Sequence, residues 1–434
     1  MTVSGSPPAL SPPAPSGDSA AVWQLRRRST CRLCDDVDLR LLFSLVSTPL
    51  ANALVAADRL DEPQAVYPLD VHFCDNCCHV QLLDVVNPEI LFRDYVYVSG
   101  TSPSFVDHFR RYAEDVFSRV AFPPAEPLVV DIGSNDGTLL RFFKDKGCRV
   151  LGIEPATLIA ERADAAGIET ISAFLNQELA EAIARDHGPA AVVTANNVFA
   201  HVDDLHGFVE AVKALLAEDG TFVFEVSYLL DVFEKTLFDT IYHEHLSYHS
   251  VKPLTTFFER HDMQLVDVQR VSSHGGSLRG FARRKAAAGK QPTVDALITT
   301  EAALGLHGPA AYRTFFENIN ERKNELRSLL QQLRREGRRV VGFGAPAKAT
   351  TLMYHFGLGP DVLEYVIDDS PLKQGLFTPG LHVPIVPSNR LYESKPDYVL
   401  ILAWNFAESI MRSHAAYSEL GGKFIVPLPT LKVY

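Results

Sequence analysis

A stretch of nine residues, YHEHLSYHS, holds three histidines, a glutamate and two tyrosines, beginning at Tyr242. Histidine and carboxylate side chains are the usual proton donors and acceptors of enzymes, and histidine also binds metals. Three interpretations are open: a metal site, an acid–base site, and a polar loop without catalytic function. A metal site would combine Glu244 with a pair of histidines two or four positions apart, but the stretch contains no HExxH helix motif. The residue types therefore favour acid–base catalysis.

Four cysteines near the N-terminus have the spacing of a zinc site. The segments CRLC and CDNC each hold two cysteines separated by two residues. A turn of this length directs both thiolates to one ion, and two such turns complete a tetrahedral site. The predicted metal ligands are Cys31, Cys34, Cys74 and Cys77. Because four protein ligands leave no open coordination position, we expect structural zinc, with a redox dithiol as the alternative.

Composition and charge limit the classes of protein to consider. A chain of 434 residues predicts two or three domains, and its formal net charge of −12 argues against general nucleic-acid binding. No apolar stretch approaches the roughly 20 residues that span a bilayer. The first 28 residues are rich in Pro, Ser and Ala and lack an apolar core, so they predict a disordered leader and not a secretory signal. The cytoplasm is therefore the expected compartment.

The elements that must position these groups begin with a βαβ pattern. PLVVDIGSNDGTLLRFFKDKGCRVLGIEPA predicts a strand, a helix and a second strand, with a glycine turn at the first crossover. The turn has two glycines and an Asp at the strand end, which suits a ligand with a positive amino group better than a pyrophosphate. S-adenosylmethionine has that chemistry, and Glu154 at the end of the second strand could accept its ribose hydroxyls. The pattern predicts a class I methyltransferase domain, with another doubly wound domain as the alternative.

Later segments continue this pattern. AAVVTANNVFAH predicts a strand followed by a polar loop, at the carboxyl end of a strand where open α/β sheets bind ligands. The predicted cofactor-binding residues are Asp131, Gly133, Ser134, Asn135, Gly137, Glu154, Asn196 and Asn197.

A second strand–turn–helix pattern opens the last third of the chain. RRVVGFGAPAKATTLMYHFGL places Gly344 in a turn and Lys348 at a helix N-terminus, where a cation suits a phosphate ligand. PDYVLILAWNF predicts a further strand with Asn405 just beyond it. These segments predict a second, smaller Rossmann-like domain. A scaffold domain without a ligand and an NAD-dependent dehydrogenase are the alternatives.

Nine motifs occur in an order that resembles one enzyme family. They are CRLC, CDNCCHVQL, YVYVSGTS, DIGSNDGTLL, GIEPA, NNVFAHVDDL, YHEHLSYHS, HGGSLRGF and GFGAPAKATTLMY. From about residue 31 to the end, the chain resembles the nucleotide-sugar C-methyltransferases of deoxysugar and antibiotic biosynthesis. The resemblance implies zinc on four cysteines, S-adenosylmethionine as cofactor, and methylation of a ring carbon beside the ketone of a dTDP-sugar.

The resemblance also implies roles for individual residues. The expected catalytic residues are His245, Glu244, Tyr242 and one of Tyr95 and Tyr97. A ketone acidifies the neighbouring ring hydrogen, which His245 with a near-neutral pKa could remove. Tyr242 or His243 could then donate a hydrogen bond to the enolate oxygen. The residues expected at the nucleotide sugar are His201, His274, Gly344, Lys348, Asp368 and Asn405.

Together these patterns predict a three-part α/β protein. The expected segments are a leader over 1–28, a zinc module over 29–90, a methyltransferase domain over 91–290, a helical linker over 291–334 and a Rossmann-like domain over 335–434. We expect a monomer that methylates a small nucleotide sugar, at carbon 3 or alternatively carbon 5, and that binds neither nucleic acid nor membrane. The alternatives are an O- or N-methyltransferase and a zinc-containing protein that binds a nucleotide without converting it.

Overall fold

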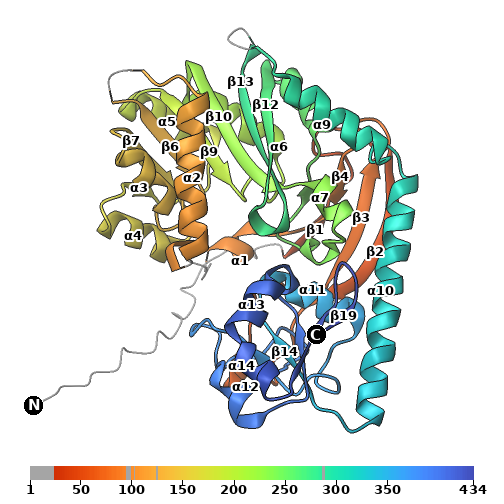
Figure 1. Ribbon diagram of the computed structural model, residues 1–434. Coiled ribbons are helices and arrows are strands. Elements are labelled where there is room, and N and C mark those ends of the chain that lie inside the picture. Colours follow the sequence, from red (N-terminus) through yellow and green to blue (C-terminus); the bar gives the residue numbers. More distant parts are fainter. Residues whose placement is uncertain (1–23, 94–98, 102, 124–125, 286–288) are drawn as a thin grey trace, which may run out of the picture.

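The computed structural model describes residues 24–434, apart from 94–98, 102, 124–125 and 286–288. Figure 1 shows two bodies, one above the other, and the long helix α10 (Ala310–Arg335) runs down one side of the molecule between them. Tyr95 and Tyr97 lie outside the described residues. Within the described residues, no helix combines the length and the apolar character needed to cross a membrane.

The upper body is built on a seven-stranded sheet in the order β12-β13-β10-β9-β6-β7-β8. Its strands are β6 (Leu128–Ile132), β7 (Arg149–Ile153), β8 (Thr170–Ile171), β9 (Ala190–Asn196), β10 (Leu216–Ser227), β12 (Met263–Val271) and β13 (Ser277–Arg284). Neighbouring strands run parallel except for β13, which is antiparallel to β10 and β12. The predicted α/β fold class is confirmed, with β6 and α3 where the sequence places them.

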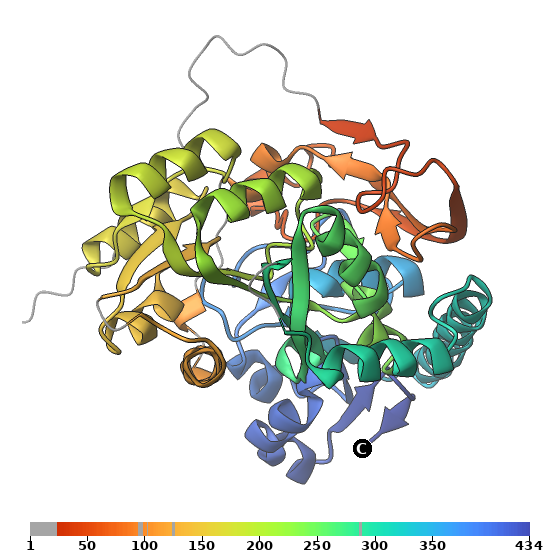
Figure 2. The same cartoon turned by 90° about the horizontal axis from the view of Figure 1, so that it is seen from above.

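Helices cover both faces of this sheet (Figure 2). They are α2 (Pro103–Arg119), α3 (Thr138–Lys144), α4 (Thr157–Ala165), α5 (Gln177–His187), α6 (Leu205–Leu215), α7 (Leu229–Glu234), α8 (Val251–Arg260) and α9 (Pro292–Ala303). Because both faces are covered, β6 is buried along its whole length and is apolar except for Asp131. The strand order reverses at β6, with β7 on one side and β9 on the other. Open α/β sheets bind ligands outside the carboxyl ends of their strands at such a point.

A four-stranded antiparallel sheet, in the order β11-β4-β3-β2, carries the cysteine turns. Its strands are β2 (Leu39–Thr48), β3 (Tyr67–Cys74), β4 (Val80–Leu82) and β11 (Ser247–Tyr248). β11 belongs to the YHEHLSYHS stretch. The cysteine turns and the predicted catalytic stretch therefore share one sheet, and the short helix α1 (Pro88–Phe92) follows it toward the upper body.

A strand lies inside the segment that the sequence predicts as a leader. Leu25–Arg27 form β1, which pairs antiparallel with β5 (Asp84–Val86), although the predicted leader extends to residue 28. Arg27 donates a hydrogen bond to Asp84 at 2.5 Å. This contact joins segments far apart in the sequence, so the polar composition of the N-terminus gave no sign of it. The C-terminal limit of the predicted leader is corrected accordingly.

The lower body contains a six-stranded sheet in the order β16-β15-β14-β17-β18-β19. Its strands are β14 (Val340–Phe343), β15 (Val366–Ile367), β16 (Ile385–Val386), β17 (Tyr398–Ile401), β18 (Lys423–Val426) and β19 (Lys432–Val433), and only β19 is antiparallel to its neighbour. Its helices are α11 (Ala347–Phe356), α12 (Asn389–Ser394), α13 (Ala407–Ser413) and α14 (Ala415–Glu419). Here the strand order reverses at β14, so a second ligand crevice is expected between β14 and β17.

Candidate active site

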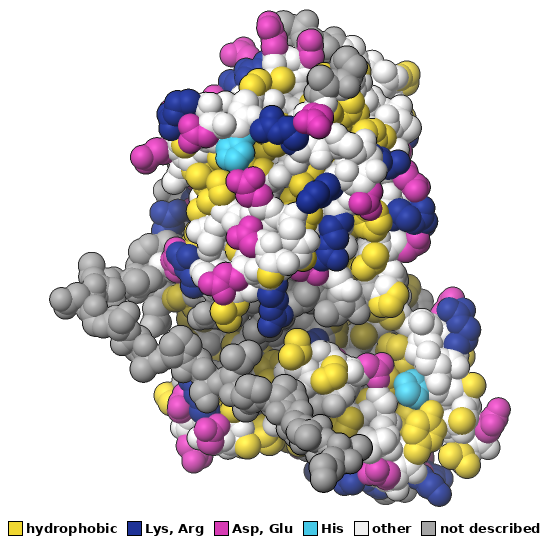
Figure 3. Space-filling model, turned by 90° about the vertical axis from the view of Figure 1, so that its left-hand side faces the viewer, with side chains coloured by type: hydrophobic (Ala, Val, Ile, Leu, Met, Phe, Trp, Pro, Cys, Tyr) yellow, Lys and Arg dark blue, Asp and Glu magenta, His cyan; other side chains and the backbone are white. Residues whose placement is uncertain are grey.

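A cleft of about 1810 Å³ lies between the two bodies, where the carboxyl ends of their parallel strands meet. Figure 3 shows the surface narrowing between the upper and the lower body. The predicted site residues that line the cleft are Asp131, Gly133, Ser134, Asn135, Glu154, Asn196, Asn197, His201, Tyr242, Glu244, His245, His274, Lys348 and Asn405. Those that do not line it are Gly137, Gly344 and Asp368. One cavity therefore collects most of the predicted cofactor, substrate and catalytic residues.

The two glycines of the turn after β6 have different tasks. Gly133 has a φ of 68°, and a Cβ added to it would lie 2.4 Å from Cγ2 of Val198. The positive φ and the close packing of Val198 both require a residue without a side chain there. Gly137, with a φ of 73°, is the N-cap residue of α3. The first glycine lets Val198 pack against the turn, whereas the second starts the helix.

Glu154, just after β7, holds this turn in place. Its Oε2 accepts a hydrogen bond from the N–H of Asn135 and its Oε1 one from the N–H of Ala156, both at 2.9 Å. Burial raises the pKa of the Glu154 carboxyl, and the two N–H groups oppose that rise. Each carboxylate oxygen retains a further lone pair. The same group can therefore hold the turn and accept hydroxyl groups of a ribose.

Asp131 and Asn196 lie near the ends of the neighbouring strands β6 and β9. Asp131 Oδ1 accepts a hydrogen bond from Thr194 Oγ1 at 2.6 Å, while burial and the nearby Glu154 raise its pKa to about 7. The Ser134 hydroxyl and both amide atoms of Asn196 are buried without a hydrogen-bond partner. Buried polar atoms of this kind need a ligand or water. A cationic ligand with polar groups, such as S-adenosylmethionine, fits this set of residues.

His245 has a defined tautomer. Its Nδ1 lies 2.7 Å from the carbonyl oxygen of Thr240. A carbonyl oxygen can only accept, so Nδ1 carries the proton and Nε2 keeps the lone pair. The sequence predicted a near-neutral pKa, but burial lowers the pKa of His245 to about 4. At neutral pH the ring is therefore an uncharged base.

Two other predicted site residues have their rings next to that of His245. The ring centroid of Tyr242 lies 4.2 Å from that of His245, and the centroid of His201 lies 5.0 Å from it on a nearly parallel plane. His201 in turn stacks on Phe92 of α1 at 5.5 Å. Burial lowers the pKa of His201 well below its ordinary value. The structure thus brings the three predicted rings into one cluster.

Glu244 is buried beside this cluster and has a partner that the sequence did not reveal. Its Oε1 accepts a hydrogen bond from Asn52 Nδ2 at 2.7 Å. Burial raises the pKa of Glu244 to about 7, although Asn52 opposes that rise. Its proton can therefore be bound or released near neutral pH. Asn52 lies between β2 and β3, outside every motif, so no local signal could have pointed to it.

A polar network at the wall of the cleft could not be predicted from the sequence either. Glu225 near the end of β10 lies 2.8 Å from His108 Nε2 and accepts a hydrogen bond from Arg279 Nη2, also at 2.8 Å. Burial would raise the pKa of Glu225, but the contacts with His108 and the Arg279 guanidinium lower it to about 2. Glu225 also accepts a hydrogen bond from Ser273 Oγ at 2.5 Å. Since Ser273 precedes His274, the network fixes the turn that brings His274 to the cleft wall.

The lower body contributes Lys348 and Asn405 to the cleft. Lys348, in the first turn of α11, has its Nζ 3.7 Å from Asp239 Oδ2 and 4.7 Å from the ring centroid of Trp404. Burial lowers the pKa of Lys348, and Asp239 opposes that change. Both Lys348 Nζ and Asn405 Oδ1 are buried without a hydrogen-bond partner. These atoms are suited to polar or anionic groups of a ligand.

Gly344 and Asp368 repeat, in the lower body, the arrangement of the glycine turn and Glu154. Gly344 follows β14 with a φ of 90°. Asp368, just after β15, accepts hydrogen bonds from the N–H of Ala345 at 2.7 Å and the N–H of Ser370 at 2.9 Å. Asp368 was predicted to contact the nucleotide sugar, but it does not line the cleft. Its oxygens hold the turn, as those of Glu154 do in the upper body, and its contact with the nucleotide sugar stays a prediction.

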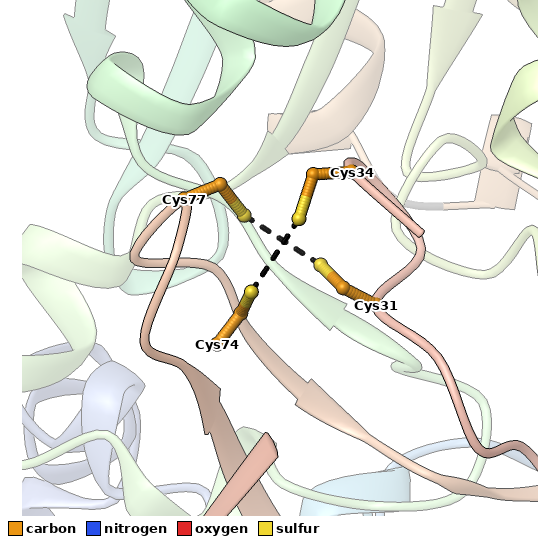
Figure 4. A group of neighbouring side chains, drawn as sticks. All are labelled: Cys31, Cys34, Cys74 and Cys77. Carbon is orange, nitrogen blue, oxygen red and sulfur yellow. Dashed lines mark hydrogen bonds between the residues drawn. The ribbon is translucent and has the colours of Figure 1, made fainter. Parts of the chain in front are cut away.

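The four predicted metal ligands converge on one point (Figure 4). The sulfur atoms of this set all lie within 4.8 Å of one another, and the set is Cys31, Cys34, Cys74 and Cys77. Sulfurs bound at about 2.3 Å to a tetrahedral zinc ion are about 3.8 Å apart, so the four atoms fit one ion.

Arg32, inside the first cysteine turn, connects this centre to the catalytic stretch. It is fully buried. Its Nη1 donates hydrogen bonds to Gln81 Oε1 at 3.1 Å and to the carbonyl oxygen of Leu246 at 3.4 Å, and its Nε donates to Asp203 Oδ1 at 3.0 Å. Leu246 directly follows His245. The zinc centre is thus one side chain away from the backbone that carries the predicted base.

Comparison with known proteins agrees with each part of this arrangement. A family model described as a putative zinc binding domain matches residues 31–92, a methyltransferase domain model matches 105–268, and a C-methyltransferase C-terminal domain model matches 272–429. The C-methyltransferase NovU of Streptomyces niveus is 37% identical over 404 residues, which cover 93% of this chain and 96% of NovU.

Two solved structures resemble about two fifths of the chain. One is the complex of a methyltransferase activator and a putative methyltransferase from Haloferax volcanii, with 15% identity, a TM-score of 0.35, and coverage of 43% of this chain and 94% of that chain. The other is magnesium protoporphyrin IX methyltransferase from Synechocystis, with 12% identity, a TM-score of 0.31, and coverage of 42% and 78%.

The zinc binding domain model covers the four cysteines, and the methyltransferase domain model covers the predicted cofactor-binding residues. S-adenosylmethionine is the cofactor of the upper body, and zinc is the metal of the four-thiolate centre. Both predicted cofactors are therefore confirmed.

Proposed function

The chain belongs to the C-methyltransferase family, and from this premise we propose that it methylates a ring carbon beside the ketone of a dTDP-4-keto-deoxysugar. Carbon 3 is the proposed position, with carbon 5 as the alternative. The observation that carries the proposal is the neutral His245 in the cofactor cleft, whose Nδ1–H is bonded to Thr240, so that the lone pair is on Nε2. Transfer to carbon requires such a base, because a C–H bond must be broken before the carbon becomes nucleophilic.

Proton removal is the first task of the chain's own residues. The ketone acidifies the hydrogen on the adjacent ring carbon, and His245 Nε2 takes that proton. The electron pair moves to the ketone oxygen, so an enolate forms with its nucleophilic carbon in the cleft. S-adenosylmethionine supplies an electrophilic methyl group on its sulfonium sulfur. Glu244, with a pKa raised by burial to about 7, can exchange a proton near His245.

A hydrogen-bond donor at the enolate oxygen would stabilise the developing charge. The sequence offered Tyr242 and His243 for this role. His243 Nε2 donates to the carbonyl oxygen of Tyr67 at 3.2 Å, and His243 does not line the cleft. Tyr242 lines the cleft next to His245, so we assign the donor role to Tyr242.

The nucleotide portion of the substrate would lie against the lower body. Lys348 offers a buried cation without a hydrogen-bond partner at the start of α11, where backbone N–H groups also favour an anion. Asn405, after β17, lies on the other side of the point where the strand order reverses. We infer that the diphosphate binds over the turn from Gly344 to Lys348 while the keto-sugar faces His245. The product, a branched-chain nucleotide sugar, would serve deoxysugar biosynthesis in the cytoplasm.

The proposal is tested with labelled S-adenosylmethionine and a panel of dTDP-sugars that differ in the position of the ketone. We expect label to enter only sugars with a 4-keto group, on a carbon bonded to the carbonyl carbon, as read by NMR. The matched control is the same sugar reduced to the 4-hydroxy form, which cannot form an enolate. Label on oxygen or nitrogen, or equal labelling of the reduced sugar, would contradict the proposal.

A further inference from the structure

The orientation of His245 depends on a backbone carbonyl in a short segment of the upper body. The proton on Nδ1 is donated to the oxygen of Thr240 at 2.7 Å, so the position of that oxygen sets the direction of Nε2. Thr240 is the last residue of η3 (Phe238–Thr240). Its side chain is also held, because Oγ1 donates to the carbonyl oxygen of Leu237 at 2.7 Å.

Two buried hydrogen bonds from the lower body hold the residues on either side of Thr240. Trp404 Nε1 donates to Asp239 Oδ2 at 2.6 Å, and Thr351 Oγ1 donates to the carbonyl oxygen of Ile241 at 2.8 Å. Asp239 is fully buried, and Trp404 and Thr351 are 7% and 1% exposed. The segment that orients His245 is therefore fixed by the body that is proposed to bind the nucleotide.

Asp239 is a costly group to bury unless it has charged or hydrogen-bonding partners. Burial raises the pKa of Asp239, whereas Lys348 and the Trp404 N–H favour its charged form. Lys348 Nζ lies 3.7 Å from Asp239 Oδ2 and also over the Trp404 ring, while Oδ1 of Asp239 has no hydrogen-bond partner. Neither Asp239 nor Trp404 has a role in the proposed mechanism.

We propose that Asp239 and Trp404 are positioning residues that hold the Thr240 carbonyl in place and thereby orient the base His245. This inference rests on the proposed role of His245 as base. It makes proton removal dependent on the docking of the lower body against η3. Neither residue lines the cleft, so we expect their effect to fall on turnover more than on binding.

The test compares Trp404→Phe with wild type. The substitution removes the donor N–H and keeps an aromatic ring beneath Lys348. We expect kcat to fall about tenfold or more, as loss of a hydrogen bond to a charged group predicts, while the KM for the nucleotide sugar and the Kd for S-adenosylmethionine change less than about twofold. Tyr417→Phe is the matched control, because its hydroxyl donates a buried hydrogen bond to the carbonyl of Pro396 at 2.9 Å within the same body. It should match wild type.

The pH profile distinguishes positioning from a general loss of stability. The bond from Nδ1 to Thr240 favours the protonated ring and so raises the pKa of His245. If that bond loosens, the pKa falls further, and the acid limb of kcat/KM moves to lower pH. Among the described residues, Tyr242, His201 and His274 face His245 and Glu244 adjoins it, and neither substitution replaces any of the four.

Asp239→Asn gives a second variant, which also serves if Trp404→Phe does not fold. The amide oxygen can still accept the indole N–H, so we expect a smaller fall in kcat and a smaller shift of the acid limb in the same direction. If the folded variants keep the wild-type kcat and pH profile while His245→Ala has lost turnover, the positioning role is wrong and the proposed function stands. A change in the KM for the nucleotide sugar without a change in kcat would also show that the positioning role is wrong. If wild type methylates no keto-sugar, both proposals fail.

Discussion

His245 and Glu244 are adjacent in the sequence, yet burial moves their pKa values in opposite directions. The pKa of His245 falls to about 4 and that of Glu244 rises to about 7. Burial disfavours the charged form of each group, which is the imidazolium for one and the carboxylate for the other. At neutral pH the pair therefore holds an uncharged base beside a carboxyl that can take up or release a proton.

The raised pKa of Glu244 predicts a pH-dependent stability. Its folded value of about 7 lies above the ordinary 4.5, so its contribution is fully present below about pH 4.5 and is lost as the pH rises through 7. Glu244→Gln carries no charge, so its free energy of unfolding should exceed that of wild type at pH 8, by on the order of 2 kcal/mol, with little difference at pH 5. Urea unfolding at both pH values measures this.

The exposed Glu408→Gln is the control for this comparison and should follow wild type at both pH values. The free energy of unfolding of Glu244→Gln should still depend on pH, because burial also raises the pKa of Asp131 to about 7. If the free energies of unfolding of Glu244→Gln and wild type differ by the same amount at pH 5 and pH 8, the pKa of Glu244 is not raised.

Glu154 predicts a selective loss of cofactor affinity. Its two oxygens hold the turn after β6 and remain able to accept ribose hydroxyls. Because hydrogen bonds to a charged acceptor are worth about 1.5–3 kcal/mol, Glu154→Ala should weaken S-adenosylmethionine binding by roughly 10- to 100-fold in calorimetry. Glu154→Gln keeps one acceptor oxygen and should lose less. The affinity for the nucleotide sugar should stay within about twofold, and an unchanged cofactor affinity would argue against the assigned ribose site.

Sequence reasoning found the residues that lie in continuous motifs and missed those that stand alone. The turn from Asp131 to Gly137 and the YHEHLSYHS stretch are dense local signals, and the structure places both at the cleft. Asn52 donates to Glu244, His108 pairs with Glu225, and Asp239 accepts from Trp404, each across a long sequence separation. Each is a single polar residue outside any pattern, so its partner becomes visible only in three dimensions.

The zinc centre is built into the same sheet as the catalytic stretch. β4 pairs with β11, and Arg32 from the first cysteine turn donates to the carbonyl of Leu246. A two-residue strand such as β11 has no periodicity of its own, which is why its pairing could not be predicted from the sequence. By contrast, strands with apolar runs and glycine turns, such as β6 and β14, were predictable.

Loss of one zinc ligand should lower thermal stability. Cys31→Ser leaves three thiolates, and we expect the Tm to fall by about 5 °C or more, as a loss of roughly 2 kcal/mol predicts for a domain of this size. Cys78→Ser is the matched control, since Cys78 is buried next to the ligand Cys77 but outside the set. Metal analysis and calorimetry measure both effects. A Cys31→Ser protein with full zinc content and an unchanged Tm would refute the assignment.

In each body, the point where the strand order reverses faces the same cleft. β6 and β9 bring the cofactor turn from above, and β14 and β17 bring Lys348 and Asn405 from below. The hydrophobic pattern predicted each body separately. Their mutual placement depends on buried contacts such as the bond from Trp404 to Asp239, which no periodicity encodes.

This arrangement predicts that the nucleotide is needed for turnover as well as for binding. Binding energy from the diphosphate in the lower body would position the sugar at His245, and remote binding energy of this kind raises kcat. The free 4-keto-sugar should therefore show a kcat/KM lower by about a hundredfold or more, with an unchanged Kd for S-adenosylmethionine. As a control, dTDP should compete with the nucleotide sugar and not with the cofactor. Equal kcat/KM for the free sugar and the nucleotide sugar would show that the lower body does not help to position the sugar.

The assignment of His245 as the base that forms the enolate is tested most directly by hydrogen exchange at the carbon beside the ketone. The experiment uses D2O and S-adenosylhomocysteine, which fills the cofactor site without a methyl group to transfer. Wild type should replace that hydrogen with deuterium in the nucleotide sugar, as followed by NMR. His245→Ala should lose exchange and methylation together, by about a hundred- to ten-thousand-fold, and still bind both ligands. Exchange at a near wild-type rate in His245→Ala would show that the base is another residue.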